Sequence, residues 1–296
     1  MHRITLDAVQ KYRGRIPVKD LDFLIVTPLE EETSAVLRRV DRAKKHGDHP
    51  SVARYLCDIK VSDRLYTSGC IVRPADSGRV EAAVATAEVL STMWFRYIVL
   101  VGIAGAIRRG NNDEAIALGD VVVADRIIDT EFQKITDYGA VLRDREFRVN
   151  PELIHEIKFF DGRATWMGLS GRSPRSRAFD GAPRMHIGPV ISGNKVMASM
   201  HEARYLSERI ARSSNSGLPL AIEMEAIGVA VAAARSGYGD RFIMFRGIND
   251  FADANKAADE EIWRERACGS AADIAIEYIR SVALSHGWGK ELEREA

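Results

Sequence analysis

The sequence has no excess of charge of either sign. Its 296 residues include 42 lysines and arginines and 42 aspartates and glutamates, so the formal net charge is zero at pH 7. Without an overall positive field, the chain lacks the usual electrostatic signature of proteins that bind DNA or RNA. We therefore expect a small-molecule substrate or a protein partner, and no nucleic-acid partner.

Cysteines and long apolar runs are also scarce. The three cysteines are widely spaced and form neither a CxxC pair nor a disulfide framework, which fits a reducing compartment. No apolar run reaches membrane-spanning length, and the first residues lack the apolar core of a signal peptide. The scattered histidines form no metal-binding pair beside an acid, so we expect neither a metal nor another cofactor. The sequence predicts a soluble cytoplasmic protein with no membrane partner.

The sequence does contain short apolar runs that alternate with helical patterns. This alternation is typical of an α/β domain whose sheet is largely buried and at least partly parallel. The predicted strands are residues 23–26, 97–102, 119–125, 188–193 and 241–248, with weaker candidates at 55–61 and 68–75. The predicted helices are residues 30–42, 79–95, 151–158, 198–212, 223–236 and 259–284.

Two segments depart from this alternation. Residues 1–20 are polar and predict an N-terminal extension, whereas residues 162–185 are rich in Gly, Ser, Pro and Arg, as loops are. The second segment is either a solvated loop or an electropositive flap over an anionic group of a substrate. We predict one domain over residues 21–286 that contains this Arg-rich insertion, followed by a C-terminal tail at 287–296.

Two stretches place carboxylates beside apolar segments. "FLIVTPLEEE" ends in three glutamates, of which the last is Glu32, and "AIEMEA" carries Glu223 and Glu225 ahead of an apolar helical pattern. Acidic residues suit the positive end of a helix, so both stretches are compatible with simple helix starts. A carboxylate at the edge of a buried face also suits a cation or a pair of ligand hydroxyls. Both interpretations stay open at this point.

Two further stretches follow apolar strands. "LVGIAGAIRRG" includes Gly102 and Gly105, whose missing side chains would let a ligand lie close to the backbone. "FIMFRGINDFAD" carries Arg246, Asn249 and Asp250 toward the carboxyl end of a strand, where open α/β sheets bind ligands. Either stretch alone is also compatible with an ordinary turn.

Taken in order, these stretches resemble the nucleoside phosphorylase superfamily, and within it the methylthioadenosine/S-adenosylhomocysteine nucleosidases. The resemblance runs from about residue 22 to 284, and its most specific blocks are "EMEA" and the R-x-I-x-D pattern of "RGIND". It implies an α/β three-layer sandwich with a mixed, partly barrel-like central sheet. It also implies an N-ribosyl hydrolase that releases adenine from an adenine nucleotide or nucleoside.

The resemblance implies three catalytic residues. Asp250 matches the general acid that donates a proton to purine N7, and we expect it to be at least partly buried. Glu32 matches the carboxylate that positions and activates the attacking water, with Arg246 in support. A carboxylate at this position would repel the phosphate that a phosphorylase must hold, which favours hydrolysis over phosphorolysis.

The resemblance also implies a set of substrate contacts. A carboxylate and a methionine hold the ribose, backbone segments line the sugar and the base, a strand edge reads the adenine, and an asparagine stands where nucleosidases commonly have a serine beside the acid. The ribose contacts are Glu225 and Met224, and the backbone that lines the sugar and the base is that of Ala104 and Gly105. The strand edge that reads the adenine comprises Lys195, Val196 and Met197, and the asparagine beside the acid is Asn249.

The stretch after Asp250 departs from the methylthioadenosine pattern. The family's aromatic residue for the apolar 5′ pocket aligns near Glu260, and several cations lie close to it in sequence or in the insertion. Such cations suit a charged 5′ group, as in the family's AMP nucleosidases and its phage-defence enzymes that split adenine from ATP. The candidate 5′ contacts are Lys256, Arg264, Arg172 and Arg175.

Two other functions compete with this prediction. One is a phosphate-dependent purine nucleoside phosphorylase, and the other is a nucleotide-sensing module that has lost turnover. The combined presence of Glu32, Glu225, Arg246 and Asp250 argues against the sensor, which needs neither the acid nor the water-holding carboxylate. Since family members are dimers, trimers or hexamers, we expect a homo-oligomer, with residues 1–20 or 130–150 as candidate interface segments.

Overall fold

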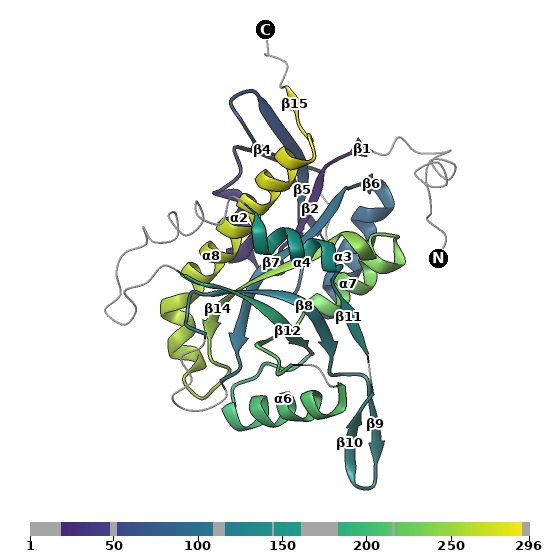
Figure 1. The fold of residues 1–296 in the computed structure, drawn as a ribbon, viewed down its shortest axis with the longest axis vertical. Helices are drawn as coiled ribbons and strands as arrows, with labels where there is room; N and C mark the ends of the chain where they lie inside the picture. Colours follow the sequence, from purple (N-terminus) through teal and green to yellow (C-terminus); the bar gives the residue numbers. More distant parts are fainter. Residues whose placement is uncertain are drawn as a thin grey trace.

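The computed structural model describes residues 19–47, 52–108, 116–143, 145–160, 183–214 and 217–291 (Figure 1). Residues 1–18, most of the Arg-rich insertion and the last five residues lie outside this part of the chain. No helix in the described ranges is both long and apolar enough to cross a membrane.

Most strands of the described chain join one mixed sheet. Its order is β11-β8-β12-β13-β7-β2-β5-β4-β3, while β14 pairs with β7 and β8, and β15 pairs with β5. All four residues of β2 are buried because β2 lies between the parallel strands β5 and β7, which explains its uninterrupted apolar run. The strands are β2 (Phe23–Val26), β3 (Arg42–Lys45), β4 (Val52–Lys60), β5 (Leu65–Pro74), β7 (Tyr97–Ala106), β8 (Val121–Asp129), β11 (Glu146–Arg148), β12 (Met185–Ser192), β13 (Ala221–Glu223), β14 (Phe242–Asp250) and β15 (Lys290–Glu291).

Part of this sheet closes on itself. Strand β14 runs parallel to β7 on one side and antiparallel to β8 on the other. Strand β8 continues through β12 and β13 back to β7, so β7, β14, β8, β12 and β13 form a closed ring. The predicted mixed, partly barrel-like sheet is therefore confirmed.

Helices cover both faces of the sheet, which confirms the predicted three-layer arrangement (Figure 1). On one face, α3 and α7 pack together, and residues such as Val89 and Ile227 join a common core. On the other face, Val36 of α2, Ile157 of α4 and Ala271 of α8 belong to a second core. The helices are α2 (Glu30–Leu37), α3 (Arg79–Thr92), α4 (Pro151–Phe159), α6 (Met200–Ser214), α7 (Ala226–Arg235) and α8 (Lys256–Ser285).

Several element boundaries differ from the sequence prediction. Helix α2 ends at Leu37 and is followed by the exposed strand β3, where we predicted a helix to residue 42. Helix α7 begins at Ala226, so Glu223 lies on a strand and not on the helix. Strand β14 continues to Asp250, so Arg246 lies in mid-strand.

Short strands outside the predicted set make up the remaining differences. Strand β1 (Lys19–Asp20) pairs with β6 (Met93–Trp94), and β9 (Gln133–Thr136) forms a hairpin with β10 (Gly139–Leu142). The segment that we predicted as a tail, residues 287–296, includes Trp288, whose ring contacts that of Tyr97 at a tilt of 47°, and the strand β15.

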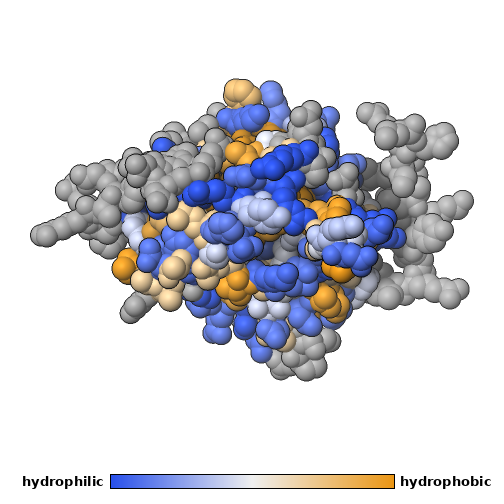
Figure 2. All heavy atoms as spheres, turned by 90° about the horizontal axis from the view of Figure 1, so that it is seen from below, coloured by the Kyte–Doolittle hydropathy of each residue, from blue (hydrophilic) through white to orange (hydrophobic). Residues whose placement is uncertain are grey.

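The hairpin projects from the end of the molecule where α6 lies (Figure 1). Figure 2 views the molecule from this end and shows mainly hydrophilic residues, with hydrophobic residues scattered among them. Two hairpin residues, Ile135 and Tyr138, expose most of their surface. This end therefore presents a mixed surface to solvent.

Candidate active site

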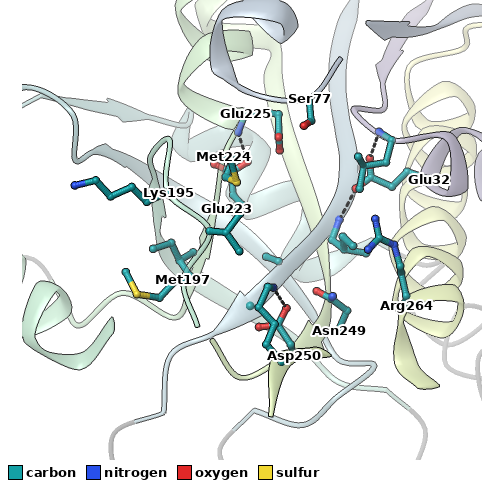
Figure 3. Close-up of a pocket in the computed structure, with 17 residues that line it drawn as sticks. Glu32, Ser77, Lys195, Met197, Glu223, Met224, Glu225, Asn249, Asp250 and Arg264 are labelled. Atoms are coloured by element: carbon teal, nitrogen blue, oxygen red, sulfur yellow. Dashed lines mark hydrogen bonds and ion pairs between the residues drawn. The ribbon is translucent and has the colours of Figure 1, made fainter. Parts of the chain in front are cut away.

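A pocket of about 300 Å³ lies where β7 and β14 end beside β13 (Figure 3). This volume is at the lower end of the range typical of small-molecule sites. The parallel strands β7 and β14 place their carboxyl ends at one sheet edge, so residues distant in sequence meet there. Twelve predicted site residues line the pocket: Glu32, Ala104, Gly105, Lys195, Val196, Met197, Met224, Glu225, Asn249, Asp250, Lys256 and Arg264.

Of the other three predicted site residues, only Arg246 belongs to the described part of the chain, and it does not line the pocket. Arg246 lies behind the pocket wall, completely buried on β14. Arg172 and Arg175 lie outside the described residues, so their predicted role as 5′ contacts stays a prediction.

Glu32 is fixed by backbone donors at the start of α2. Its Oε2 accepts the N–H of Leu29 at 2.7 Å, which caps the helix, and its Oε1 accepts the N–H of Ile103 on β7 at 2.8 Å. Glu30 and Glu31 are exposed, whereas Glu32 is buried. The helix-start interpretation therefore holds for the whole triplet, but only Glu32 also faces the pocket.

Burial dominates the protonation of Glu32. Loss of hydration raises its pKa to about 7, although the Arg246 guanidinium and the two backbone donors favour the charged form. Glu225 adds to the rise because a second carboxylate nearby disfavours ionisation. Glu32 therefore changes charge close to neutral pH.

Glu223 and Glu225 share the connection between β13 and α7 but have different partners. Oε2 of Glu223 accepts the N–H groups of Glu225 at 3.1 Å and Ala226 at 2.9 Å, so Glu223 serves the start of the helix. Oε1 of Glu225 accepts the N–H of Gly78 at 3.1 Å, and burial raises the pKa of Glu225. Both side chains line the pocket, but only Glu223 accepts backbone N–H groups from the start of α7.

Arg246 links the three buried glutamates from behind. Its Nη2 donates to Glu223 and, at 3.2 Å, to Oε2 of Glu225, and its Nη1 lies 3.7 Å from Oε1 of Glu32. We call Glu32, Glu223 and Glu225 the carboxylate wall. One guanidinium faces three carboxylates, so the wall carries an excess of negative charge when all three are ionised. Arg246 thus contacts the whole wall and not Glu32 alone.

The two glycines of "LVGIAGA", which we predicted to let a ligand lie close to the backbone, also leave room for charged side chains. A Cβ at Gly102 would collide with Nη1 of Arg246 and with the Glu32 carboxylate. A Cβ at Gly105 would lie 2.6 Å from Oδ1 of Asp250. Gly102 therefore makes room for charged side chains, and Gly105 both does this and lines the pocket.

Asp250 ends β14 and is completely buried. Its Oδ1 accepts the N–H of Ala252 at 2.7 Å, and its Oδ2 lies 2.5 Å from Nζ of Lys256. Ala252 has φ of 52°, a left-handed conformation that is costly for a residue with a Cβ. Within the described chain, no other non-glycine residue has a positive φ. This turn brings the first residue of α8 back to the acid.

Three cations line the pocket and are at least partly accessible to solvent. Lys195 is exposed, the Lys256 side chain keeps 20% of its surface accessible, and the Arg264 side chain keeps 33%. Nε of Arg264 lies 3.2 Å from Oε1 of Glu31. We call Lys195, Lys256 and Arg264 the cationic rim.

The segment predicted to read the adenine is a loop. Strand β12 ends at Ser192, so Lys195, Val196 and Met197 lie between β12 and α6 and not on a strand edge. Glu131 supports this loop, because its Oε1 accepts the N–H of Asn194 at 2.8 Å. All three predicted residues still reach the pocket, as Figure 3 shows for Lys195 and Met197.

Sequence reasoning left five lining residues out of the predicted site, of which Glu223 and Ser77 have polar side chains and the others are Leu29, Ile103 and Ile222. Glu223 was noted as half of a carboxylate pair, but a carboxylate before a helix indicates a cap, which it also is. Ser77 precedes α3 in the "SGRVEAAVATA" block and carries no charge that would single it out. Among the described residues, no group of three or more His, Cys, Asp or Glu side chains is arranged to hold a metal ion.

The fold and the pocket define an α/β small-molecule enzyme with carboxylates on two sides of one cavity. The chain belongs to the phosphorylase superfamily, whose family model matches residues 22–280. This confirms the family membership that the sequence predicts.

Two nucleosidases of known activity are similar to this chain in sequence. The chain is 23% identical over 240 residues to the 5′-methylthioadenosine/S-adenosylhomocysteine nucleosidase of Mycobacterium bovis, a match that covers 77% of this chain and 86% of the relative. It is 26% identical over 244 residues to the ATP nucleosidase Cap17 of Escherichia coli, covering 78% of this chain but only 44% of that protein. Both are nucleosidases, the enzyme class that the sequence predicts.

A solved structure shows the same fold. The methylthioadenosine/S-adenosylhomocysteine nucleosidase of Neisseria meningitidis, crystallised with methylthio-immucillin-A, aligns with a TM-score of 0.65. The alignment covers 89% of this chain and all of that chain, at 20% sequence identity.

Proposed function

We propose that the protein is an N-ribosyl hydrolase that releases adenine from an adenine nucleotide or nucleoside, with the nucleotide preferred. The observation that carries this proposal is the placement of buried carboxylates on two sides of the pocket. Asp250 lies on one side, and Glu225 of the carboxylate wall lies across the cavity (Figure 3). Cleavage of an N-glycosidic bond needs an acid at the base and negative charge near the sugar.

Asp250 is our candidate for the acid. Adenine is a poor leaving group as an anion, so a proton delivered to N7 lets it depart neutral. Asp250 is buried at the end of β14, and Asn249 lies beside it in the lining. Oδ1 of Asp250 accepts the Ala252 N–H, so Oδ2, which contacts Lys256 in this structure, is the oxygen that would donate to the base.

The carboxylate wall suits the sugar. Glu225 offers acceptors to the two ribose hydroxyls, and Met224 beside it supplies an apolar surface under the ring. The excess negative charge of the wall stabilises a ribosyl cation as the bond to the base breaks. Arg246 is a positioning residue in this scheme, since it holds the wall from behind and does not touch the cavity.

Glu32 is our candidate for the residue that holds the attacking water. Its pKa of about 7 allows it to accept a proton from water at neutral pH. The same site is unfavourable for a phosphate dianion, because three carboxylates of the wall repel it in a medium of low dielectric. Hydrolysis is therefore favoured over phosphorolysis.

The cationic rim favours a substrate with a charged 5′ group. Lys256 is the first residue of α8, and Arg264 lies further along the same helix. Both line the pocket, where ammonium and guanidinium groups can hold phosphate oxygens. The relation to an ATP nucleosidase supports a nucleotide, whereas the relation to methylthioadenosine nucleosidases supports a nucleoside.

An adenine-release assay tests the proposal. Adenosine, methylthioadenosine, S-adenosylhomocysteine, AMP and ATP are each incubated with the enzyme, with and without phosphate, and products are separated by chromatography. We expect adenine and a free ribosyl product without any phosphate requirement, and faster turnover of the nucleotides. The Asp250→Asn variant should be slower by about 10²–10⁴-fold, whereas Asp253→Asn, a neighbouring acid that caps Asn255, should retain activity.

Three other results would contradict the proposal in different ways. Activity that appears only with phosphate would make the protein a phosphorylase. Binding of adenine nucleotides without any adenine release would make it a sensor. Turnover of methylthioadenosine that equals or exceeds that of the nucleotides would remove the preference for a charged 5′ group.

A further inference from the structure

The acid of the proposed reaction is already occupied at both oxygens. Oδ1 of Asp250 accepts the Ala252 N–H, and Oδ2 contacts Nζ of Lys256 at 2.5 Å. The ion pair is shielded, because Asp250 is buried and the Lys256 side chain is only 20% accessible. Oδ2 is the oxygen not held by the backbone, so it is the one that a purine N7 would have to reach.

This ion pair opposes proton donation. An ammonium group beside a carboxylate favours the ionised form, whereas a general acid must be neutral when the base departs. While Lys256 stays on Oδ2, this oxygen is not free to reach a purine N7.

Once Lys256 moves away, nearby acidic residues favour protonation of a carboxylate. The pKa of Asp259 on α8 is raised by burial and by the charges of Asp253 and Asp250, with Arg108 acting in the opposite direction. Asp259 therefore lies close enough to Asp250 and Asp253 to sense both charges, although only Asp250 lines the pocket. Without the ammonium of Lys256, their mutual repulsion favours uptake of a proton by one of them.

Lys256 can reach a second partner. It is the first residue of α8, and its ammonium lies at the end of a flexible four-carbon stem beside Arg264 on the cationic rim. In an anti nucleotide the C8 edge of the purine lies over C5′, so N7 and the 5′-phosphate are on the same side of the ligand. A phosphate bound at the rim thus competes with Asp250 for Lys256.

We propose that Lys256 is a substrate-responsive positioning residue. In the free enzyme it holds Asp250 in an ion pair. The 5′-phosphate of a bound nucleotide draws Lys256 away, so that Asp250 can take up a proton and deliver it to the base. This proposal rests on the proposed function. According to this proposal, the 5′-phosphate is required for rapid cleavage and does not only contribute to binding affinity. A nucleoside without phosphate would leave the ion pair in place and be cleaved slowly.

The test compares adenosine with AMP in wild-type protein and in Lys256→Met. We expect kcat/KM for AMP to fall by roughly tenfold or more, while kcat for adenosine rises because the acid is released. Lys256→Arg should retain the preference for AMP. Lys134→Met, an exposed lysine on β9, is the matched control and should leave both substrates unaffected. Lys256→Gln provides a second neutral side chain, and thermal unfolding checks that each variant is folded.

The possible outcomes separate the switch from the reaction itself. A collapse of the AMP-to-adenosine ratio with faster adenosine turnover supports the switch. A loss for AMP with unchanged adenosine turnover overturns it, because Lys256 would then only bind the phosphate. Equal losses for both substrates in folded Lys256→Met and Lys256→Gln overturn it while leaving the hydrolase function intact. A wild-type protein that releases no adenine from either substrate, or from ATP, overturns the proposed function and the switch together.

Discussion

The carboxylate wall and the cationic rim lie on the same pocket but are built in opposite ways. Wall residues are buried, accept backbone N–H groups from neighbouring elements and share one guanidinium. Rim residues stand on a loop and on the first turns of α8, with partly accessible side chains. The wall is suited to fixed electrostatic stabilisation of a transition state, whereas the rim can move and can adapt to the substrate.

Glu32→Gln should give the largest effect, because it removes the wall residue that we propose accepts a proton from water. We expect kcat for adenine release to fall by about 10²–10⁴-fold, with the fold retained. Glu30→Gln is the matched control, since Glu30 belongs to the same helix turn but is exposed. If steady-state assays give the same rates for the two variants, the wall plays no part in activating water.

Arg246→Met tests the stability of the wall, with Arg264→Met as its counterpart on the rim. Removal of Arg246 leaves three buried carboxylates without their shared cation, so the free energy of unfolding should fall by about 3–5 kcal/mol. The partly exposed pair of Arg264 with Glu31 should contribute less than about 1 kcal/mol. Urea unfolding monitored by circular dichroism measures both values. Similar losses would mean that wall and rim do not differ in the way that we describe.

The raised pKa of Glu32 makes the free energy of unfolding depend on pH, and this effect is smaller than the loss expected for Arg246→Met. Burial raises this pKa from its ordinary value of 4.5 to about 7 in the folded protein. Between these two pH values the folded state holds a proton that the unfolded state has lost, so stability falls as the pH rises across the window. The contribution is at most about 3 kcal/mol.

Unfolding free energies of wild type and Glu32→Gln between pH 4.5 and 8 isolate this contribution. The wild type should lose stability relative to the variant as the pH rises through the window. The pKa of Glu225 is also raised, but that residue is present in both proteins, so the difference between them reports mainly on Glu32. A constant difference would show that Glu32 does not titrate there.

The buried strands and the long helices could be predicted from the sequence because their apolar residues occupy the positions that are buried in the fold. The strand at residues 23–26 agrees with β2, and α8 extends the predicted helix by only a few residues. The exposed strand β3 and the hairpin β9–β10 could not be predicted, since their residues do not alternate between apolar and polar. Their conformation is fixed by pairing with other strands, which the local sequence does not encode.

The wall was partly predictable and the ion pair of Asp250 was not. Glu32 and Glu225 were recognised because each lies in a conspicuous block, and both line the pocket. The roles of Gly102 and Arg246 depend on contacts between separate strands. The contact of Lys256 with Asp250 depends on the left-handed turn at Ala252, an alanine that no sequence rule assigns to that conformation.

The closed ring of β7, β14, β8, β12 and β13 sets how the site responds to thermal motion. Strands β7, β13 and β14 supply Gly105, Glu223 and Asp250, and each is hydrogen-bonded to a neighbour on both sides. A ring has no free edge from which one strand can fray, so this part of the site opens only in cooperative unfolding of the domain. Sequence change can therefore alter the loop after β12 and the start of α8 at little risk to the fold, whereas change in the ring alters the whole protein.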